Sequence, residues 1–189
     1  MIRAAAVTAA AVTTFTALAC AQEPKREPTQ QEKLGNWTIS RTVSKMDDSK
    51  GLFAYVDGTP YRDTFGDKTP SLVVRCAEGK TALYLDMKTY IAMEGTRPVT
   101  LRVGSGKART AHWPVSTDFN AIGAWSGPES IPLIRELAKA KTAVLRVCPA
   151  ILSDIDMSFD LEGLDRVAAE LSQLCRWPVP KTSGSTASK

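Results

Sequence analysis

The feature that most constrains the fold of this chain is an alternation of apolar and polar residues, clearest in one segment and repeated less regularly in five others. In residues 155–161, Ile155, Met157, Phe159 and Leu161 fall on one side, with Asp and Ser residues between them. Successive side chains of a β-strand point to opposite faces, so this pattern predicts a strand with one buried face and one wet face. The same alternation occurs in residues 37–43, 71–76, 82–87, 99–103 and 143–148. Strands of this kind are typical of antiparallel sheet.

Two segments replace this alternation with helical spacing. In residues 130–140, Ser130 is placed to cap a helix, Pro132 suits the first turn, and the apolar residues recur on one side. In residues 163–175 the apolar residues again recur every three or four positions. We therefore expect an α+β fold, an antiparallel β-sheet or small β-sandwich with a C-terminal amphipathic helix and one further short helix.

The N-terminus has the composition of an export signal. Arg3 supplies a positive charge, residues 4–18 contain only Ala, Val, Thr, Phe and Leu, and polar residues follow from Gln22. The apolar run is shorter than the roughly 20 residues that a membrane-spanning helix needs. The sequence therefore predicts a signal peptide at residues 1–20 and a protein of the periplasm.

The end of this leader allows two processing routes. Residues 19–21, Ala-Cys-Ala, offer a cleavage site before Gln22, whereas residues 17–20 resemble a lipobox in which Cys20 is acylated and becomes the new N-terminus. Ala17 stands where a lipobox usually has Leu, but a cysteine directly after a small residue at this point is uncommon by chance. We expect lipidation of Cys20 and anchoring of the protein to a membrane.

Composition divides the remainder into a tether, one domain and a tail. Residues 21–34 suit a polar, solvated tether, and residues 179–189 suit a disordered polar tail. Residues 35–178 are enough to bury one sizeable core. Without Arg3 the basic count falls from 24 to 23 against 20 acidic residues, and the basic residues are scattered rather than gathered in a stripe. We therefore expect no nucleic-acid partner.

Two of the cysteines are predicted to form a disulfide, because each lies on the buried side of its strand or helix. Cys76 shares its face with Leu72 and Val74, and Cys175 lies on the apolar stripe of the helix, so both thiols point toward the core. An exported chain meets oxidising conditions, and we predict a Cys76–Cys175 disulfide. Cys148 falls on the opposite face of its strand and is left over. Because the chain has no Cys-x-x-Cys spacing, we expect no metal site and no cofactor.

Several motifs together resemble the TagO/VasI family, small exported proteins named for their association with type VI secretion gene clusters. The motifs are WTISRTVSKMDDS from Trp37, PSLVVRC from Pro70, HWPVSTD from His112, and MSFDLEGL from Met157 through to LCRW ending at Trp177. The similarity covers residues 35–178, the whole predicted domain. It implies the fold and the compartment, and it carries over no biochemical activity.

Two patterns were weighed as catalytic sites. His112 precedes Ser116 and Asp118 by four and six residues, but residues this close on a strand or turn rarely converge as a triad. Asp156 and Asp160 share the polar face of one predicted strand, where exposure to solvent is the simpler interpretation. We predict no catalytic residues.

Four residues form the predicted partner surface. Asp47 and Asp48 follow the first alternating segment, and Arg75 lies on the wet face of a strand that could run beside them. These charges form either an ion pair that orders the loop or a polar surface that binds a partner. Trp113 is the fourth residue, although core packing is the default for it and for the later tryptophans.

These observations favour a non-enzymatic accessory protein of the bacterial envelope, tethered to a membrane and bound to an envelope or secretion-system protein. The alternative is a small hydrolase or inhibitor that acts on cell-wall material. A wet cleft lined by two carboxylates would favour the enzyme. A flat surface or an open strand edge would favour the binding protein.

Overall fold

Two antiparallel sheets, a short hairpin and two helices make up the part of the chain that the computed structural model describes, residues 31–150 and 152–178. One sheet has six strands in the order β1-β2-β3-β6-β7-β10, and the other has four in the order β12-β11-β8-β9. The predicted signal peptide, Cys20 and the tail at residues 179–189 lie outside the described residues. Neither helix in the described ranges has the length and hydropathy needed to cross a membrane.

The elements have the following bounds. The six-stranded sheet contains β1 (Gln31–Leu34), β2 (Trp37–Val43), β3 (Lys50–Asp57), β6 (Ser71–Ala77), β7 (Lys80–Asp86) and β10 (Ala121–Ala124). The four-stranded sheet contains β8 (Thr96–Val103), β9 (Arg109–Pro114), β11 (Thr142–Val147) and β12 (Ile155–Asp160). The hairpin consists of β4 (Tyr61–Asp63) and β5 (Gly66–Lys68), and the helices are α1 (Gly127–Leu137) and α2 (Leu164–Leu174).

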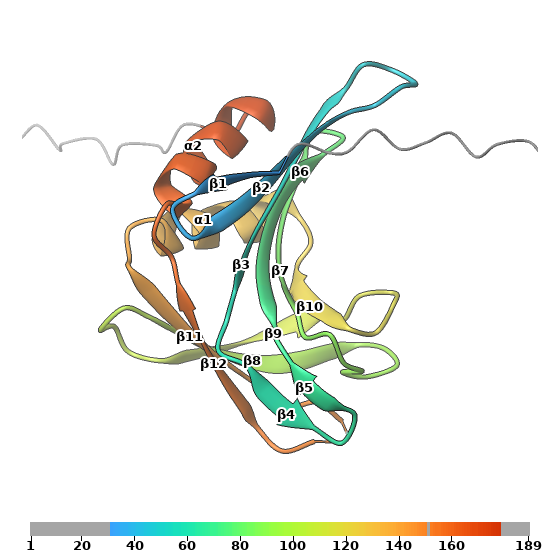
Figure 1. Ribbon diagram of the computed structural model, residues 1–189, viewed down its shortest axis with the longest axis vertical. Coiled ribbons are helices and arrows are strands. Elements are labelled where there is room, and N and C mark those ends of the chain that lie inside the picture. Colours follow the sequence, from blue (N-terminus) through green and yellow to red (C-terminus); the bar gives the residue numbers. More distant parts are fainter. Residues whose placement is uncertain (1–30, 151, 179–189) are drawn as a thin grey trace, which may run out of the picture.

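One face of the six-stranded sheet carries the core. Figure 1 shows both helices over one end of this sheet and the four-stranded sheet at its other end. Leu72, Val74 and Cys76 of β6 are buried there, as the alternation predicted. They belong to a single cluster that extends through both sheets and both helices. The predicted α+β class and the C-terminal helix are therefore confirmed.

The structure also corrects the expected elements. Residues 31–34, assigned to the tether, form β1 and pair with β2. Strand β3 escaped prediction because Phe53 and Tyr55 on its wet face are aromatic and hide the alternation. Helix α1 begins one turn earlier than expected, with Ser126 at the N-cap position and its hydroxyl bonded to the Glu129 carboxylate rather than to a backbone amide. Ser130 is instead fully buried, with its hydroxyl 2.8 Å from the carbonyl oxygen of Ser126.

Two glycines allow α2 to start against the turn between β1 and β2. Gly163 has a φ of +95° and Gly35 a φ of +63°, backbone conformations that favour glycine. A Cβ on Gly163 would lie 2.1 Å from the carbonyl oxygen of Leu34, so no side chain fits there. The amide of Asn36 donates a hydrogen bond of 3.0 Å to the carbonyl of Glu162. This contact joins the first strands of the domain to its last helix.

The other end of α2 is held to β6 by the Cys76–Cys175 disulfide, which confirms the predicted pairing. Its Cα atoms are 5.9 Å apart, and the cysteines are 99 positions apart in sequence. Trp177 lies two positions after Cys175, and its indole N–H donates a 2.7 Å hydrogen bond to Thr81 Oγ1 of β7. Cys148 is exposed and unpaired with any cysteine of the described residues. The C-terminal end of the domain is therefore fastened to two adjacent strands.

Candidate functional site

The opposite, outer face of the six-stranded sheet holds an open hollow of about 470 Å³. Strands β6, β7 and β10 form its floor, and the loop between β9 and β10 forms one wall. We call it the outer hollow, and its principal residues are Arg75, Tyr84, Asp86, Ser116, Asp118 and Trp125. The residues come from segments far apart in sequence that the sheet brings together.

Two stacked aromatic rings form the floor of the outer hollow. The rings of Tyr84 and Trp125 have centroids 4.8 Å apart and an interplanar angle of 27°. Tyr84 faces Gly123 across the β7–β10 pair, and a Cβ on Gly123 would lie 2.3 Å from the Tyr84 Cβ. Gly123 therefore makes the room in which Tyr84 lies. The indole N–H of Trp125 donates a 3.0 Å hydrogen bond to the carbonyl of Pro114, which fixes the orientation of the ring.

Arg75 adds a positive charge above this floor. Its guanidinium carbon is 5.7 Å from the centroid of the Tyr84 ring, a cation–π distance. No hydrogen bond or ion pair joins Arg75 to another side chain of the described residues. The pKa of Tyr84 is raised because the phenol is partly buried, and the negative charges of Asp86 and Asp118 act in the same direction while Arg75 opposes them. Tyr84 is therefore a neutral hydrogen-bonding group at physiological pH.

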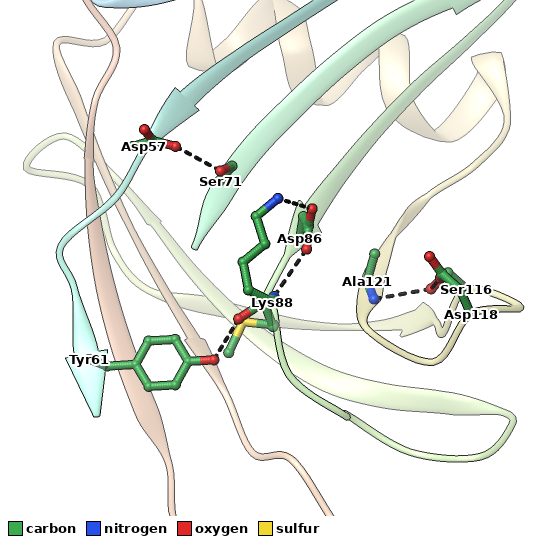
Figure 2. Close-up of polar contacts among 9 residues, drawn as sticks. Asp57, Tyr61, Ser71, Asp86, Lys88, Ser116, Asp118 and Ala121 are labelled. Atoms are coloured by element: carbon green, nitrogen blue, oxygen red, sulfur yellow. Dashed lines mark hydrogen bonds and ion pairs between the residues drawn. The ribbon is translucent and has the colours of Figure 1, made fainter. Parts of the chain in front are cut away.

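A short polar loop forms the wall. The hydroxyl of Ser116 donates to a carboxylate oxygen of Asp118 and accepts a 3.0 Å hydrogen bond from the amide of Ala121, as Figure 2 shows. The next residue, Phe119, has a φ of +63°, an uncommon conformation for a residue with a side chain. The serine thus holds the loop closed and leaves the second oxygen of Asp118 free.

The lower end of the outer face is acidic. Asp57, Ser71 and Asp86 lie side by side in one row across β3, β6 and β7. Ser71 donates a 2.7 Å hydrogen bond to Asp57, and Lys88 forms an ion pair with Asp86 (Figure 2). Nearby, the hydroxyl of Tyr61 donates 2.6 Å to the carbonyl of Met87. The Tyr61 contact anchors the β4–β5 hairpin. The ion pair with Lys88 engages Asp86, one of the two carboxylates that line the hollow.

The structure separates the four residues of the predicted partner surface. Arg75 lies in the outer hollow, but Asp47 and Asp48 belong to the projecting β2–β3 turn and form no ion pair with it. Asp47 accepts a 2.8 Å hydrogen bond from the hydroxyl of Ser49. Hydrogen bonds from Ser44 and Ser49 lower its pKa. The alternative of an ion pair with Arg75 is therefore wrong, because Asp47 accepts hydrogen bonds within its own turn.

The prediction that Trp113 belongs to a partner surface is wrong. Trp113 is 7 % exposed and belongs to the core cluster. Trp125 holds the surface position instead. The sequence signal that distinguishes the two is local: Trp113 lies within an alternating strand, β9, whereas Trp125 directly follows the small residues of β10 and precedes a helix cap.

The patterns weighed as catalytic have structural roles. Asp156 forms a two-pronged pair with Arg146, at 2.6 and 2.7 Å, which lowers the pKa of the carboxyl. His112 is exposed on β9, while Ser116 bonds Asp118. Within residues 31–150 and 152–178, no group of three His, Cys, Asp or Glu side chains is arranged to hold a metal ion.

Comparisons with known proteins agree with this architecture. The sequence model of a family described as type VI secretion system VasI and EvfG matches residues 3–177. Among solved structures, the crystal structure of invasion associated protein B from Bartonella henselae is similar, with a TM-score of 0.52 and 16% sequence identity. The match covers 78% of this chain and 98% of that one, and it shows a common fold. The sequence matches no curated protein.

Proposed function

The chain belongs to the VasI family, which is associated with type VI secretion, and we propose that it is an exported accessory protein that binds a component of the envelope or secretion system through the outer hollow. The observation that carries this proposal is the set of Arg75, Tyr84 and Trp125 on a sheet face that the core does not use. Trp, Tyr and Arg are the residues most enriched where binding energy concentrates. Here two of them are held in place before any ligand arrives.

Export and anchoring form the second part of the proposal. A disulfide in the native fold fits a protein that matures outside the cytoplasm, and the leader composition fits the same route. Acylation of Cys20 would leave the domain on a short chain of about 10 residues before β1 begins, with an extended reach of roughly 35 Å.

The anchoring test is the partition of the native protein between detergent and aqueous phases. With acylated Cys20 the protein enters the detergent phase, and Cys20→Ser releases it into the aqueous phase or blocks its processing. A mature N-terminus at Gln22 in the wild-type protein would contradict the anchor.

The binding test is photo-crosslinking in the producing bacterium. A photoreactive residue at Arg75 should give a discrete crosslinked product, and the Trp125→Ala substitution in the same chain should remove it. Arg102, exposed on the other sheet, is the matched control position and should give none. Equal products from both positions, or a product that survives Trp125→Ala, would contradict a site in the outer hollow.

One observation favours the second candidate, a small cell-wall-directed hydrolase or inhibitor. Asp86 and Asp118 are two carboxylates that line the same open hollow. Against catalysis, Asp86 is paired with Lys88 and Asp118 with Ser116. Purified protein incubated with peptidoglycan distinguishes the candidates. Release of soluble fragments that is lost in Asp86→Asn or Asp118→Asn would support the hydrolase, and an intact polymer supports the binding protein.

A further inference from the structure

We infer that the outer hollow is a saccharide site that holds a segment of an envelope glycan against the Tyr84–Trp125 floor. The saccharide site rests on the proposed function, because it names the ligand of the same hollow. Three properties of the hollow carry it: a stacked pair of aromatic rings, a wall of short polar side chains, and a neighbouring strand edge that is short and partly covered.

The aromatic floor matches the shape of a sugar ring. A pyranose has a broad face of C–H groups and a rim of hydroxyls, so it stacks flat on an aromatic ring while its edge stays polar. Tyr84 and Trp125 stack on each other and Arg75 lies over Tyr84, so the ring face left for a sugar in the open hollow is the outer face of Trp125. The volume of about 470 Å³ is within the range of small-molecule sites.

The rim of the hollow supplies hydrogen-bonding groups that the fold leaves unused. In the part of the chain that the structure describes, no hydrogen bond engages the side chains of Arg75, Thr117 or Asn120. Asp118 uses one carboxylate oxygen for Ser116, and among residues 31–150 and 152–178 the other oxygen has no side-chain partner. Together these groups offer both donors and acceptors, as the paired roles of a sugar hydroxyl require.

A peptide ligand fits the hollow less well. An extended peptide commonly binds by adding a strand to an open sheet edge. Strand β10 is the last of its sheet, but it has only four residues, and the chain leaving β9 covers part of its edge through the Val115–Ile122 bridge and a 2.8 Å hydrogen bond from the amide of Ser116 to the carbonyl of Ala121. The aliphatic side chains in the lining are only Val115 and Ala121, so the hollow lacks the apolar pocket that anchors a protein side chain.

The site is built before the ligand arrives. Gly123 makes room for Tyr84, the carbonyl of Pro114 holds the indole of Trp125, and α1 starts directly after that residue with Ser126 at its cap. A ligand therefore orders few side chains when it binds, which reduces the entropy lost on association.

The test is calorimetric titration of the purified full-length protein with three probes. The probes are a β-1,4-linked N-acetylglucosamine tetramer, soluble peptidoglycan fragments, and purified lipopolysaccharide O-chains. We expect saturable binding of at least one probe, and the one that binds identifies the source of the glycan. Trp125→Ala and Asn120→Ala should each weaken binding by about tenfold or more, equal to roughly 1.4 kcal/mol.

Two controls keep the test decisive. Met46→Ala changes a residue that is 94% exposed on the distant β2–β3 turn and should leave the affinity unchanged. Asn120→Ala removes a surface amide, so it tests the site even where Trp125→Ala lowers the stability. Absence of saturable binding to all three probes, or unchanged affinity in both hollow variants, would overturn the saccharide site.

The result is separable from that of the proposed function. Crosslinking of a protein at Arg75 without binding of any glycan probe would keep the hollow as a binding site and reject the saccharide. Glycan binding without any loss of the crosslinked product in Trp125→Ala would reject the proposed crosslinking surface and keep the saccharide site.

Discussion

The two faces of the six-stranded sheet are made by alternate residues of the same strands, yet they differ in what determines them. On β7, Leu83 and Leu85 point inward and are fully buried, whereas Tyr84 between them points outward and is half-buried. The inner face requires only that its residues be apolar and of suitable volume. The outer face instead carries specific residues such as Tyr84. Their arrangement into a hollow depends on a loop more than thirty positions later in the chain. In the proposed function, the inner face of β7 serves stability and its outer face serves binding.

Among changes on the inner face, removal of the disulfide should lower the stability of the fold the most. Cys76→Ala or Cys175→Ala should each lower the free energy of unfolding by about 4 to 5 kcal/mol, because the bond closes a loop of about 100 residues in the unfolded chain. The double variant should lose little more than either single variant, since the two thiols act as a unit. Urea unfolding without reductant measures this. Additive losses in the double variant would contradict it.

Truncation of one inward side chain should be the next largest effect. Leu83→Ala leaves a cavity in a fully buried site and should lower the free energy of unfolding by about 3 kcal/mol. Phe53→Ala is the matched change on the outer face, where the ring is 37% exposed, and it should lose about 1 kcal/mol or less. Equal losses in denaturant unfolding would show that both faces support the fold alike.

Trp125→Ala tests how much an aromatic residue of the outer face contributes to stability. The variant loses the stack on Tyr84, an interaction of about 1 kcal/mol, and should keep the circular dichroism spectrum of the wild-type protein. Thermal unfolding and the spectrum together measure this. A loss as large as that of Leu83→Ala would place Trp125 among the core residues and would weaken its assignment to binding.

The raised pKa of Tyr84, a residue of the outer face, makes the free energy of unfolding depend on pH. The folded protein keeps the phenol proton to higher pH than the unfolded chain does. The free energy of unfolding should therefore fall as pH rises above the ordinary tyrosine pKa of about 10. Tyr84→Phe should remove part of this fall above about pH 10. Parallel pH profiles of the variant and the wild-type protein would contradict the assignment.

Cys148→Ser should have the smallest effect. The thiol is exposed, and a hydrogen bond to Asp154 raises its pKa, so it is less reactive at neutral pH than an ordinary thiol. The free energy of unfolding should change by less than about 0.5 kcal/mol. A larger change in urea unfolding, or rearrangement of the disulfide seen by peptide mapping, would give Cys148 a structural role.

The same contrast explains what could be predicted from sequence. The alternation of Leu72, Val74 and Cys76 reports burial directly, so the inner face and the disulfide followed from it. The alternation pattern does not predict which outward-pointing side chains contact one another. The sequence therefore does not show that Arg75 lies over Tyr84 rather than beside Asp47. It also does not distinguish Trp125 from the other tryptophans, because the position of Trp125 depends on the β10 pairing and the start of α1.

The disulfide also decides how the domain responds to tension along its backbone. A force applied between the two ends first peels β1 from β2, because it acts on Gln31, at the end of the pair away from the turn. Beyond Cys76 the load passes through the sulfur bridge to Cys175, and the backbone between the two cysteines, which are 99 positions apart, carries none. At about 3.4 Å per residue, roughly 340 Å of chain is withheld from extension. Tyr84, Asp118 and Trp125 all lie within that unloaded loop, so pulling on the chain cannot draw their strands out.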